Sequence, residues 1–410
     1  MIPSSIFPEM NVLVTHPGRQ HSHQLARALH ESGWLAGYWT GVPSAPPASR
    51  GPVYRWLAEW SPQPTLDLPA DRMRHCYVDP FTRRLADALC PPARAVVWQH
   101  RSKAWFDRWC ARRLPGDLDA FVCYENAALH TFRAAKERGV TTILDAASFH
   151  HQWQDAVYDP VESPAAHAAI NGHKADEIAL ADHVLTVSEL ARESYVEAGV
   201  PDDTVTSVPM GAELTDFAPP SPPREPDGAP LTFLFVGHAG RRKGIDTLQA
   251  ASRRLRDAGV AHRVQCAGGA DEGTFDDAPA TVEHLGYLGR RALVQAMHRA
   301  DVLVLPSRHD SFGRVVVEGM ATGLPALVSE HVGAKEVLRE GESGWVVPAE
   351  DVQALADRMR RCAAHPEAVA DMQAAAVAAA QDYTWAAYRE RVTGVLENIV
   401  RDAAPTAVPT

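Results

Sequence analysis

The chain has 410 residues, of which 46% are hydrophobic and 22% charged, with a formal net charge of -11 at pH 7. This length suffices for two or three domains with their own cores, and the acidic balance argues against nucleic acid as the main partner. The six cysteines show no CxxC spacing, so we expect reduced core residues of a cytoplasmic protein. No apolar run reaches the ~18 residues of a membrane span, and we expect neither a transmembrane helix nor a signal peptide.

The N-terminal segment predicts the opening of a doubly wound α/β domain. Residues 10–15 (MNVLVT) form an apolar strand pattern, a loop with Gly18 follows, and a helix is expected over 22–32. In such domains ligands bind at the carboxyl ends of the strands. The loop also holds His16, His21 and His23, but no acidic or thiolate partner lies at metal-ligand spacing. We therefore expect these histidines near a bound phosphate or an acceptor hydroxyl.

The next hundred residues are less informative. Residues 41–94 are rich in proline and lack periodicity, so we expect loops and short helices that elaborate a binding site. Residues 98–114 predict a helix with Trp105 and Trp109 four residues apart among several basic residues. Two interpretations stay open: an amphipathic helix on an anionic membrane surface, or a surface helix whose tryptophans pack on the core.

Further strands and helices complete the predicted first domain. Strands are expected at 120–124, 142–144, 183–187 and 205–208, and helices at 129–138, 167–181 and after Ser188, which is placed to cap the last of them. Asp145 and His150 follow the second of these strands at its carboxyl end, where site residues are expected. Alternatively, Asp145 caps the turn and His150 is an ordinary surface histidine.

A second domain is predicted beyond the linker at 218–230 (APPSPPREPDGAP), whose prolines favour an extended spacer. A strand at 231–236 leads into a loop with Gly237, His238, Arg242 and Lys243, and a helix follows over 245–258. Backbone N–H groups, the helix dipole and cations at one place favour a bound diphosphate. A strand at 263–267, a short segment at 282–288 and a helix at 293–299 come next.

The stretch from 302 to 348 carries the most specific pattern. A buried strand at 302–305 is followed by a loop and a helix over 314–321, which Gly323 ends, and a strand at 326–328 follows. Free N–H groups at 311–314 would suit an anion or a ring of hydroxyls, and Gly313 allows close approach. Asp310 and Glu318 are eight residues apart, roughly 12 Å along a helix, so two carboxylates could hold opposite ends of one ligand. Helices at 352–364, 368–379 and 385–400 end the chain.

Taken together, the lysine loop, the acidic pair, Gly-Leu-Pro at 323–325 and Thr-Trp at 384–385 resemble the retaining glycosyltransferases of family 4, of the "glycosyl transferases group 1" type with the GT-B fold. The resemblance covers 185–400 strongly and 10–184 more weakly. It implies that Asp310, Ser311, Phe312 and Gly313 face the donor sugar, with the N–H of Arg314 at the same helix start. It implies that Glu318 binds the nucleotide ribose.

The resemblance also assigns the remaining candidates. Lys243 binds the diphosphate, and Gly18 approaches the diphosphate or the acceptor. The usual arginine after Gly237 is His238 here, so the second cation is Arg242, Arg241 or protonated His238. The segment that ends at Leu288 contacts the base, and Asp145 and His150 lie on the acceptor side. The chain departs from the family in Asp310, where Glu is usual, and in Met210, where Asn is common.

We therefore predict an α/β protein of GT-B fold with two Rossmann-like doubly wound domains facing a central cleft. The expected boundaries are 1–217 for the acceptor domain, 218–230 for the linker, 231–383 for the donor domain, 384–402 for a helix returning to the first domain, and 403–410 for a flexible tail.

The predicted function is transfer of a hexose from a nucleotide-diphosphate sugar, of UDP or GDP type, to a sugar, glycolipid or small-molecule acceptor with retention of configuration. We expect no cofactor and no essential metal, since the Asp117-Leu118-Asp119 sequence is far from the phosphate loop. A catalytically silent subunit, or an epimerase or phosphorylase of the same fold, are the alternatives. We expect cytoplasmic localisation, with peripheral membrane contact through 98–114 as an open alternative.

Overall fold

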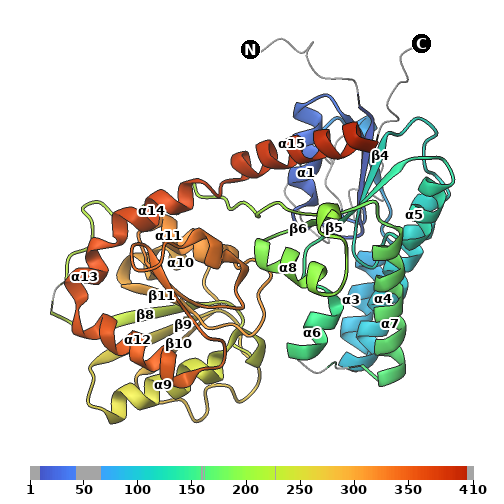
Figure 1. Cartoon of the computed structure of the whole chain (residues 1–410). Coiled ribbons are helices and arrows are strands. Elements are labelled where there is room, and N and C mark those ends of the chain that lie inside the picture. The colour runs from blue at the N-terminus through green and yellow to red at the C-terminus, as the bar shows by residue number, and fades with distance from the viewer. Residues whose placement is uncertain (1–9, 43–65, 158–159, 161, 227, 404–410) are drawn as a thin grey trace.

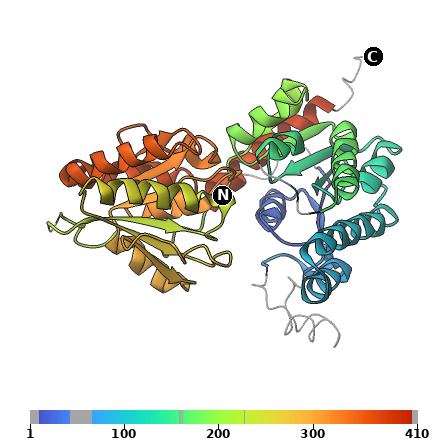
Figure 2. The ribbon, with the colours of Figure 1, turned by 90° about the horizontal axis from the view of Figure 1, so that it is seen from below.

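The computed structural model describes residues 10–42, 66–157, 160, 162–226 and 228–403. They form two α/β domains, each built around one parallel sheet, and Figure 1 shows them as two lobes bridged at the top by α15 (Trp385–Ala403). Figure 2 shows the same two lobes side by side from below. Part of the predicted loop region (43–65) and the predicted tail from 404 onward lie outside the described residues.

The first domain contains a seven-stranded parallel sheet in the order β3-β2-β1-β4-β5-β6-β7. Its central strands are apolar and fully buried because helices cover both faces of the sheet. The strands are β1 (Val12–His16), β2 (Leu35–Thr40), β3 (Met73–His75), β4 (Ala120–Tyr124), β5 (Thr141–Ala146), β6 (His183–Thr186) and β7 (Val205–Ser207).

The second domain contains a six-stranded parallel sheet in the order β10-β9-β8-β11-β12-β13. In both sheets the strand order reverses beside the first strand, between β1 and β4 and between β8 and β11, and such switch points are where doubly wound sheets bind ligands. The strands are β8 (Leu231–Val236), β9 (His262–Ala267), β10 (Val282–Gly286), β11 (Val302–Leu305), β12 (Ala326–Ser329) and β13 (Gly344–Val347).

The helices flank these sheets. Those of the first domain are α1 (Ser22–Glu31), α3 (Val78–Leu89), α4 (Pro92–Ala111), α5 (Leu129–Lys136), α6 (His151–Val157), α7 (Pro164–Leu180) and α8 (Glu189–Glu197). Those of the second are α9 (Ile245–Asp257), α10 (Arg290–Arg299), α11 (Arg314–Ala321), α12 (Val352–Ala364), α13 (Pro366–Asp371) and α14 (Gln373–Gln381). Short 3-10 helices include η4 (Arg241–Lys243) and η5 (Gly333–Val337).

The last helix, α15, starts at the second domain and packs against α1 of the first. Trp385, Tyr388, Val392 and Leu396 recur at three- and four-residue spacing and are buried in the core of the first domain. Arg389 Nε lies 3.0 Å from Glu31 Oε2 at the edge of this contact.

The predicted fold class is confirmed, since both domains are Rossmann-like and parallel. The predicted helix over 368–379 is wrong in one respect: the segment forms α13 and α14, which are separated at Met372. The sequence analysis also missed β2, β3 and β13, which are short or, in β2, interrupted by Gly37. Ser188 caps α8 as predicted, and its hydroxyl accepts the N–H of Ala191.

Candidate functional site

Loops that follow the carboxyl ends of strands in the two sheets meet between the domains. Ser311 Oγ, after β11, donates to the carbonyl of Ala147, after β5, at 2.9 Å. The rings of Phe149 and His309, from the same two loops, lie edge to face at 4.8 Å. Ser188 Oγ, at the start of α8, donates to the carbonyl of Ser311 at 2.7 Å. The structure thus joins the predicted acceptor side and the predicted donor side.

On the first-domain side, a buried pair links the loop after β1 to the end of β5. Both carboxylate oxygens of Asp145 lie 3.0 Å from Nε2 of His21, and both side chains are almost fully buried. Gly18 lies in the same loop, where its N–H donates to Nδ1 of His16 at 2.7 Å. Burial lowers the pKa of His16 to about 3, so this imidazole stays neutral.

His150 lies at the other end of the loop after β5. Its backbone N–H donates to Ser194 Oγ at 2.9 Å, and its ring contacts those of His151 and Tyr195. Burial, and next the neighbouring His151, lower the pKa of His150 to about 4. The structure therefore places Asp145 at the end of β5 and His150 in the loop that follows, near the domain interface, but does not join their side chains.

On the second-domain side, the loop after β8 forms a tight turn, η4, ahead of α9. Gly244 has a φ of +72°, and a Cβ there would lie 1.9 Å from the carbonyl oxygen of Pro306 after β11, so only glycine fits. Gly237 has a φ of +145° and lies beside the aliphatic chain of Lys243. His238 is exposed, and its Nε2 lies 2.7 Å from Asp271 Oδ1.

Two predicted donor residues, Lys243 and Asp310, form an ion pair at the carboxyl ends of β8 and β11. Both side chains are largely buried, at 14% and 12% exposure. Arg242 is exposed, and its guanidinium donates to the carbonyl of His309 at 3.0 Å, next to this pair. Lys243 and Asp310, which are 67 residues apart in the chain, therefore meet at the same edge of the second sheet.

The amino end of α11 follows Asp310 directly. Gly313 precedes the helix with a φ of +89°, and a Cβ there would lie 3.1 Å from Val332 and 3.3 Å from Asp310 Oδ2. Among hydrogen bonds of the described residues, none is donated by the backbone N–H groups of Ser311 through Arg314. Phe312 itself is buried in the core of the second domain.

Glu318 and Leu288 lie farther along the second domain. Glu318, on α11, is half-buried, and burial raises the pKa of its carboxyl, which Arg314 and Arg290 oppose. Leu288 is half-buried between β10 and α10 and packs against the core of the second domain.

Arg308 is a residue of the site that the sequence analysis missed. Its two terminal nitrogens bind both carboxylate oxygens of Asp246 on α9 at 2.6 and 2.8 Å, and one also donates to the carbonyl of Arg241 at 2.6 Å. Its Nε forms an ion pair with Glu350 at 2.9 Å. This buried guanidinium ties the loop after β11 to the turn of η4, but nothing in its local sequence distinguishes it from a surface arginine.

No group of His, Cys, Asp and Glu among the described residues is arranged to hold a metal ion. Asp119, the second acid of the 117–119 sequence, accepts the backbone N–H of Asn11 at 2.7 Å beside β1 and β4. In the described part of the chain, no helix has the length and hydropathy needed to span a bilayer.

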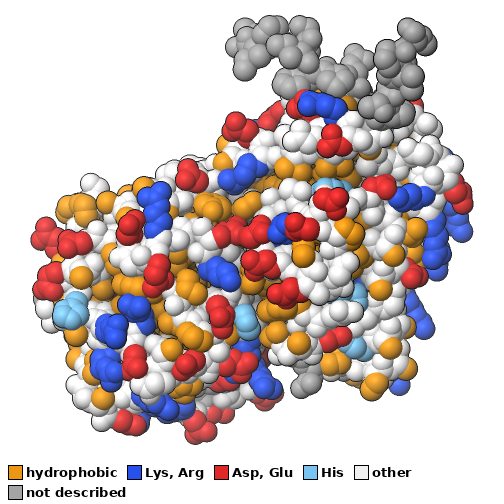
Figure 3. Space-filling view, viewed as in Figure 1, with side chains coloured by type: hydrophobic (Ala, Val, Ile, Leu, Met, Phe, Trp, Pro, Cys, Tyr) orange, Lys and Arg blue, Asp and Glu red, His pale blue; other side chains and the backbone are white. Residues whose placement is uncertain are grey.

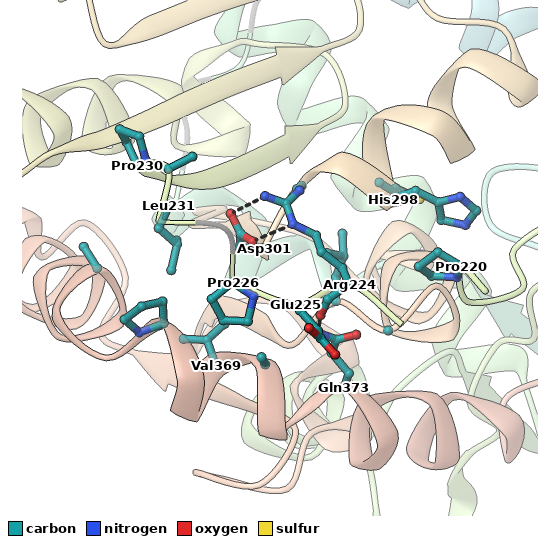
Figure 4. A pocket seen from close by; sticks show the side chains of 18 of the residues that line it. Pro220, Arg224, Glu225, Pro226, Pro230, Leu231, His298, Asp301, Val369 and Gln373 are labelled. Carbon is teal, nitrogen blue, oxygen red and sulfur yellow. Dashed lines mark hydrogen bonds and ion pairs between the residues drawn. The ribbon is translucent and has the colours of Figure 1, made fainter. Parts of the chain in front are cut away.

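A cavity of about 270 Å³ lies between the linker and α13 and α14, away from these loops (Figure 4). Its main polar feature is the ion pair of Arg224 with Asp301, whose Nε and Oδ1 are 3.1 Å apart. Gln373 donates to the carbonyl of Arg224 at 2.8 Å. These contacts hold the linker against the second domain, and none of the predicted site residues lines the cavity.

Residues 221–378 match the family described as Glycosyl transferases group 1. A putative colanic acid biosynthesis glycosyltransferase (WcaL) of Salmonella typhimurium is 27% identical over 53% of this chain and 57% of its own length. A D-inositol 3-phosphate glycosyltransferase of Nocardia farcinica is 27% identical over 80% of this chain and 75% of its own length. The chain thus spans little more than half the length of the first of these relatives.

Two solved structures share the fold of nearly the whole chain. Sucrose-phosphate synthase of Thermosynechococcus elongatus superposes with a TM-score of 0.69 at 18% identity, covering 96% of this chain and all of that one. HepE of Anabaena, solved with UDP, gives a TM-score of 0.61 at 14% identity over 95% of this chain and all of that one. The comparisons support the predicted resemblance at the level of the group 1 family and the GT-B fold.

Proposed function

We propose that this chain is a retaining glycosyltransferase of family 4 that transfers a hexose from a nucleotide-diphosphate sugar to an acceptor hydroxyl. Its match to the group 1 glycosyl transferase family and its GT-B fold support this proposal. The observation that carries the proposal is the meeting of Lys243, Asp310 and the amino end of α11 at the carboxyl ends of β8 and β11. That place is the switch point of the second sheet, where doubly wound sheets bind nucleotides.

In this proposal the donor lies along the second domain. The diphosphate is held by the ammonium of Lys243, with Arg242 and the turn at Gly237 and His238 beside it. The sugar lies against Asp310 and the backbone of Ser311, Phe312 and Gly313, while Glu318 binds the ribose about one turn into α11 and Leu288 borders the base. Support comes from the largely buried cation of Lys243 and the N–H groups at the start of α11, which suit an anion and sugar hydroxyls.

The chemistry follows from charge that develops on the leaving group. When the bond between the anomeric carbon and the diphosphate breaks, negative charge grows on the phosphate oxygen, and Lys243 and Arg242 stabilise it electrostatically. The acceptor hydroxyl then attacks from the face that the diphosphate leaves, and the leaving phosphate oxygen takes its proton. This route retains configuration and requires no second catalytic carboxylate of the glycosidase kind.

We assign Asp145 and His150 to the acceptor side. The buried Asp145 carboxylate fixes the ring of His21, so it acts by orienting that imidazole and the loop with Gly18. His150 stays neutral near pH 7 because burial depresses its pKa to about 4, so its ring can donate or accept a hydrogen bond without carrying charge. Both are positioned by the loop that Ser311 contacts from the donor side.

We propose that the α3–α4 hairpin contacts an anionic membrane surface. Five of the six exposed large hydrophobic side chains in the described part of the chain lie on it: Phe81, Leu85, Leu89, Trp98 and Trp105. Residues 78–113 hold eight Lys and Arg against three Asp, of which Asp79 and Asp107 are buried. Lys and Arg side chains also line the right-hand edge of the first domain in Figure 3, where Figure 1 labels α5, the helix that packs against α4. Aromatic and basic side chains together suit the headgroup region of a bilayer.

The spacing on α4 makes this surface specific. Arg94, Trp98, Arg101, Trp105 and Arg108 are all exposed and recur at alternating four- and three-residue intervals, which is one face of a helix. The tryptophan next to the core, Trp109, instead contacts Trp39 edge to face at 5.6 Å. In this proposal α4 packs Trp109 on the core and presents Trp98 and Trp105 to the membrane, so both interpretations drawn from its sequence apply.

The test of the proposed function is a thermal-shift screen with UDP, GDP, ADP, TDP and CDP and their sugars, with and without EDTA. UDP is the first to test, because the GT-B fold is shared with a protein solved with UDP bound. A ligand at 100 times its Kd stabilises by about 2.7 kcal/mol, which a melting curve detects. Stabilisation by one nucleotide series, with sugar transfer to an added acceptor, supports the proposal.

The same experiment distinguishes the alternatives. A silent subunit would bind the donor without turning it over, an epimerase would convert the donor without an acceptor, and a phosphorylase would require inorganic phosphate. Absence of stabilisation by every nucleotide would refute the proposed function.

A further inference from the structure

A cavity of about 300 Å³ lies in the first domain between α4, α6 and α7, which are neighbours in Figure 1. It opens beside the loop of Asp145 and His150, because Gln154 in its wall donates to Ser148 Oγ at 3.1 Å and to the carbonyl of Phe149 at 2.5 Å. The cavity is therefore adjacent to the interface with the donor domain. It is also lined by Lys103 from α4 and Lys174 from α7.

On one side of the cavity, two acids are paired by contacts of their own. His167 lies between two carboxylates, 2.9 Å from Asp155 Oδ1 and 2.8 Å from Glu162 Oε1, and these raise its pKa. Asn171 donates to the other oxygen of Asp155 at 2.8 Å. These acids therefore have partners and are not available to the lysines.

The two lysines are in a different situation. Both are half-buried, and neither ammonium group forms a hydrogen bond or an ion pair with any residue in the described ranges. Burial lowers the pKa of Lys103, and Asp79 and Glu125 oppose this from a distance. Glu125 accepts the hydroxyl of Tyr195 at 2.8 Å, and burial raises its pKa, so it compensates the two ammonium groups only in part. Two half-buried ammonium groups that share one cavity and have no partner among the described residues favour an anion between them.

We propose that this cavity binds a phosphate monoester carried by the acceptor, with Lys103 and Lys174 as its ligands. This inference rests on the proposed function, because it names the class of acceptor for the same reaction. A phosphate monoester carries close to two negative charges at neutral pH and matches two ammonium groups. The phosphate belongs either to a soluble sugar phosphate or to a lipid headgroup. Glucose 6-phosphate is the probe for the first source, and dihexanoyl phosphatidic acid is the probe for the second.

The test measures binding of glucose 6-phosphate, glucose and dihexanoyl phosphatidic acid by calorimetry to the full chain with the Lys243→Ala substitution, which weakens phosphate binding at the proposed donor site. Lys103→Met and Lys174→Met are each expected to weaken the phosphate ligand by about tenfold or more, the size of one charged hydrogen bond. Lys136→Met is the matched control, because Lys136 is exposed and paired with Asp182 on the surface. Glucose is expected not to bind at these concentrations.

A preference for glucose 6-phosphate supports a soluble acceptor, and a preference for the lipid supports a membrane-bound one. Equal affinity in the parent and in the Lys103→Met, Lys174→Met double variant, or no binding of either phosphate, would overturn the inference. If the variants do not fold, reductive methylation of the unaltered chain gives the answer, because bound glucose 6-phosphate should protect Lys103 and Lys174 but not Lys136. Nucleotide binding is measured separately on the unaltered chain, so failure of the proposed function is seen independently.

Discussion

Lys243 has two expected roles, one in catalysis and one in the stability of the folded chain, and its replacement affects both. In the proposed function, Lys243 is a cation at the diphosphate that stabilises the transition state, and the loss of one such group costs about 2.7–4 kcal/mol, or 10²- to 10³-fold in turnover. As the partner of a carboxylate that is only 12% exposed, it also stabilises the folded chain. Its removal leaves a largely buried charge unpaired, which costs on the order of 1–3 kcal/mol.

A double-mutant cycle with Lys243→Met and Asp310→Asn tells these roles apart. We expect Lys243→Met to lower both the free energy of unfolding, followed by denaturant titration, and the rate of donor turnover by about 10²-fold or more. In the double variant the neutral amide needs no cation, so stability should return toward that of the parent. Turnover should stay low, because the diphosphate still lacks its cation and the sugar lacks the Asp310 carboxylate; the Asp310→Asn single variant measures the second loss.

The control is Arg241→Met, which removes an exposed cation from the same turn. It should leave turnover within a few fold of the parent. If the double variant regained turnover together with stability, Lys243 would merely neutralise Asp310, and the assignment of its ammonium to the diphosphate would be refuted.

Four further perturbations test other contacts. Glu318→Ala should weaken nucleotide affinity by about tenfold, the size of one charged hydrogen bond, and unchanged affinity in calorimetry would place the ribose elsewhere. Gly333→Ala places a Cβ 2.2 Å from the Ser311 carbonyl oxygen and should lower both the melting temperature and turnover. Gly394→Ala, whose Cβ meets nothing within 4 Å, is the control and should lower neither. The Trp98→Ala, Trp105→Ala double variant should sediment less with phosphatidylglycerol vesicles than the parent. Equal sedimentation of the two proteins would refute membrane contact through the α3–α4 hairpin. Burial raises the pKa of Glu336 to about 7, so the free energy of unfolding should fall between pH 4.5 and 7 by up to about 3 kcal/mol and level off above. Glu336→Gln should abolish that slope, and a slope that persisted would assign it to other groups.

Local patterns in the sequence predict the elements that carry the donor side. The apolar run at 231–236 and the glycine turn after it, and the run at 302–305 with Gly313 before the next helix, each contain their own start and stop signals. Because both are parallel strands, their carboxyl ends meet at one edge of the sheet. The proximity of the lysine loop to the acidic pair therefore follows from topology once the strands are recognised.

The contacts that complete the site are not encoded locally. His21 and Asp145 are 124 residues apart, and each alone resembles an ordinary loop residue. Arg308 owes its role to Asp246 and Glu350, which approach it from different elements. Strand β3 was also missed, because its three residues are too few to show an alternating apolar pattern within the Pro-rich region before α3.

The position of Lys103 and Lys174 shows why the acceptor side is harder to predict than the donor side. The donor groups lie at strand ends, where chain order determines their neighbours, whereas these lysines come from the sides of two helices 71 residues apart that topology alone does not bring together. Helix α4 presents arginines and tryptophans to solvent on one face and Lys103 to the cavity on another. An acceptor whose phosphate occupied that cavity while its carrier lay in a bilayer would contact two different faces of α4. Because Trp98 and Trp105 are on the solvent face and not in the cavity, their replacement by alanine should reduce vesicle binding but leave glucose 6-phosphate binding unchanged.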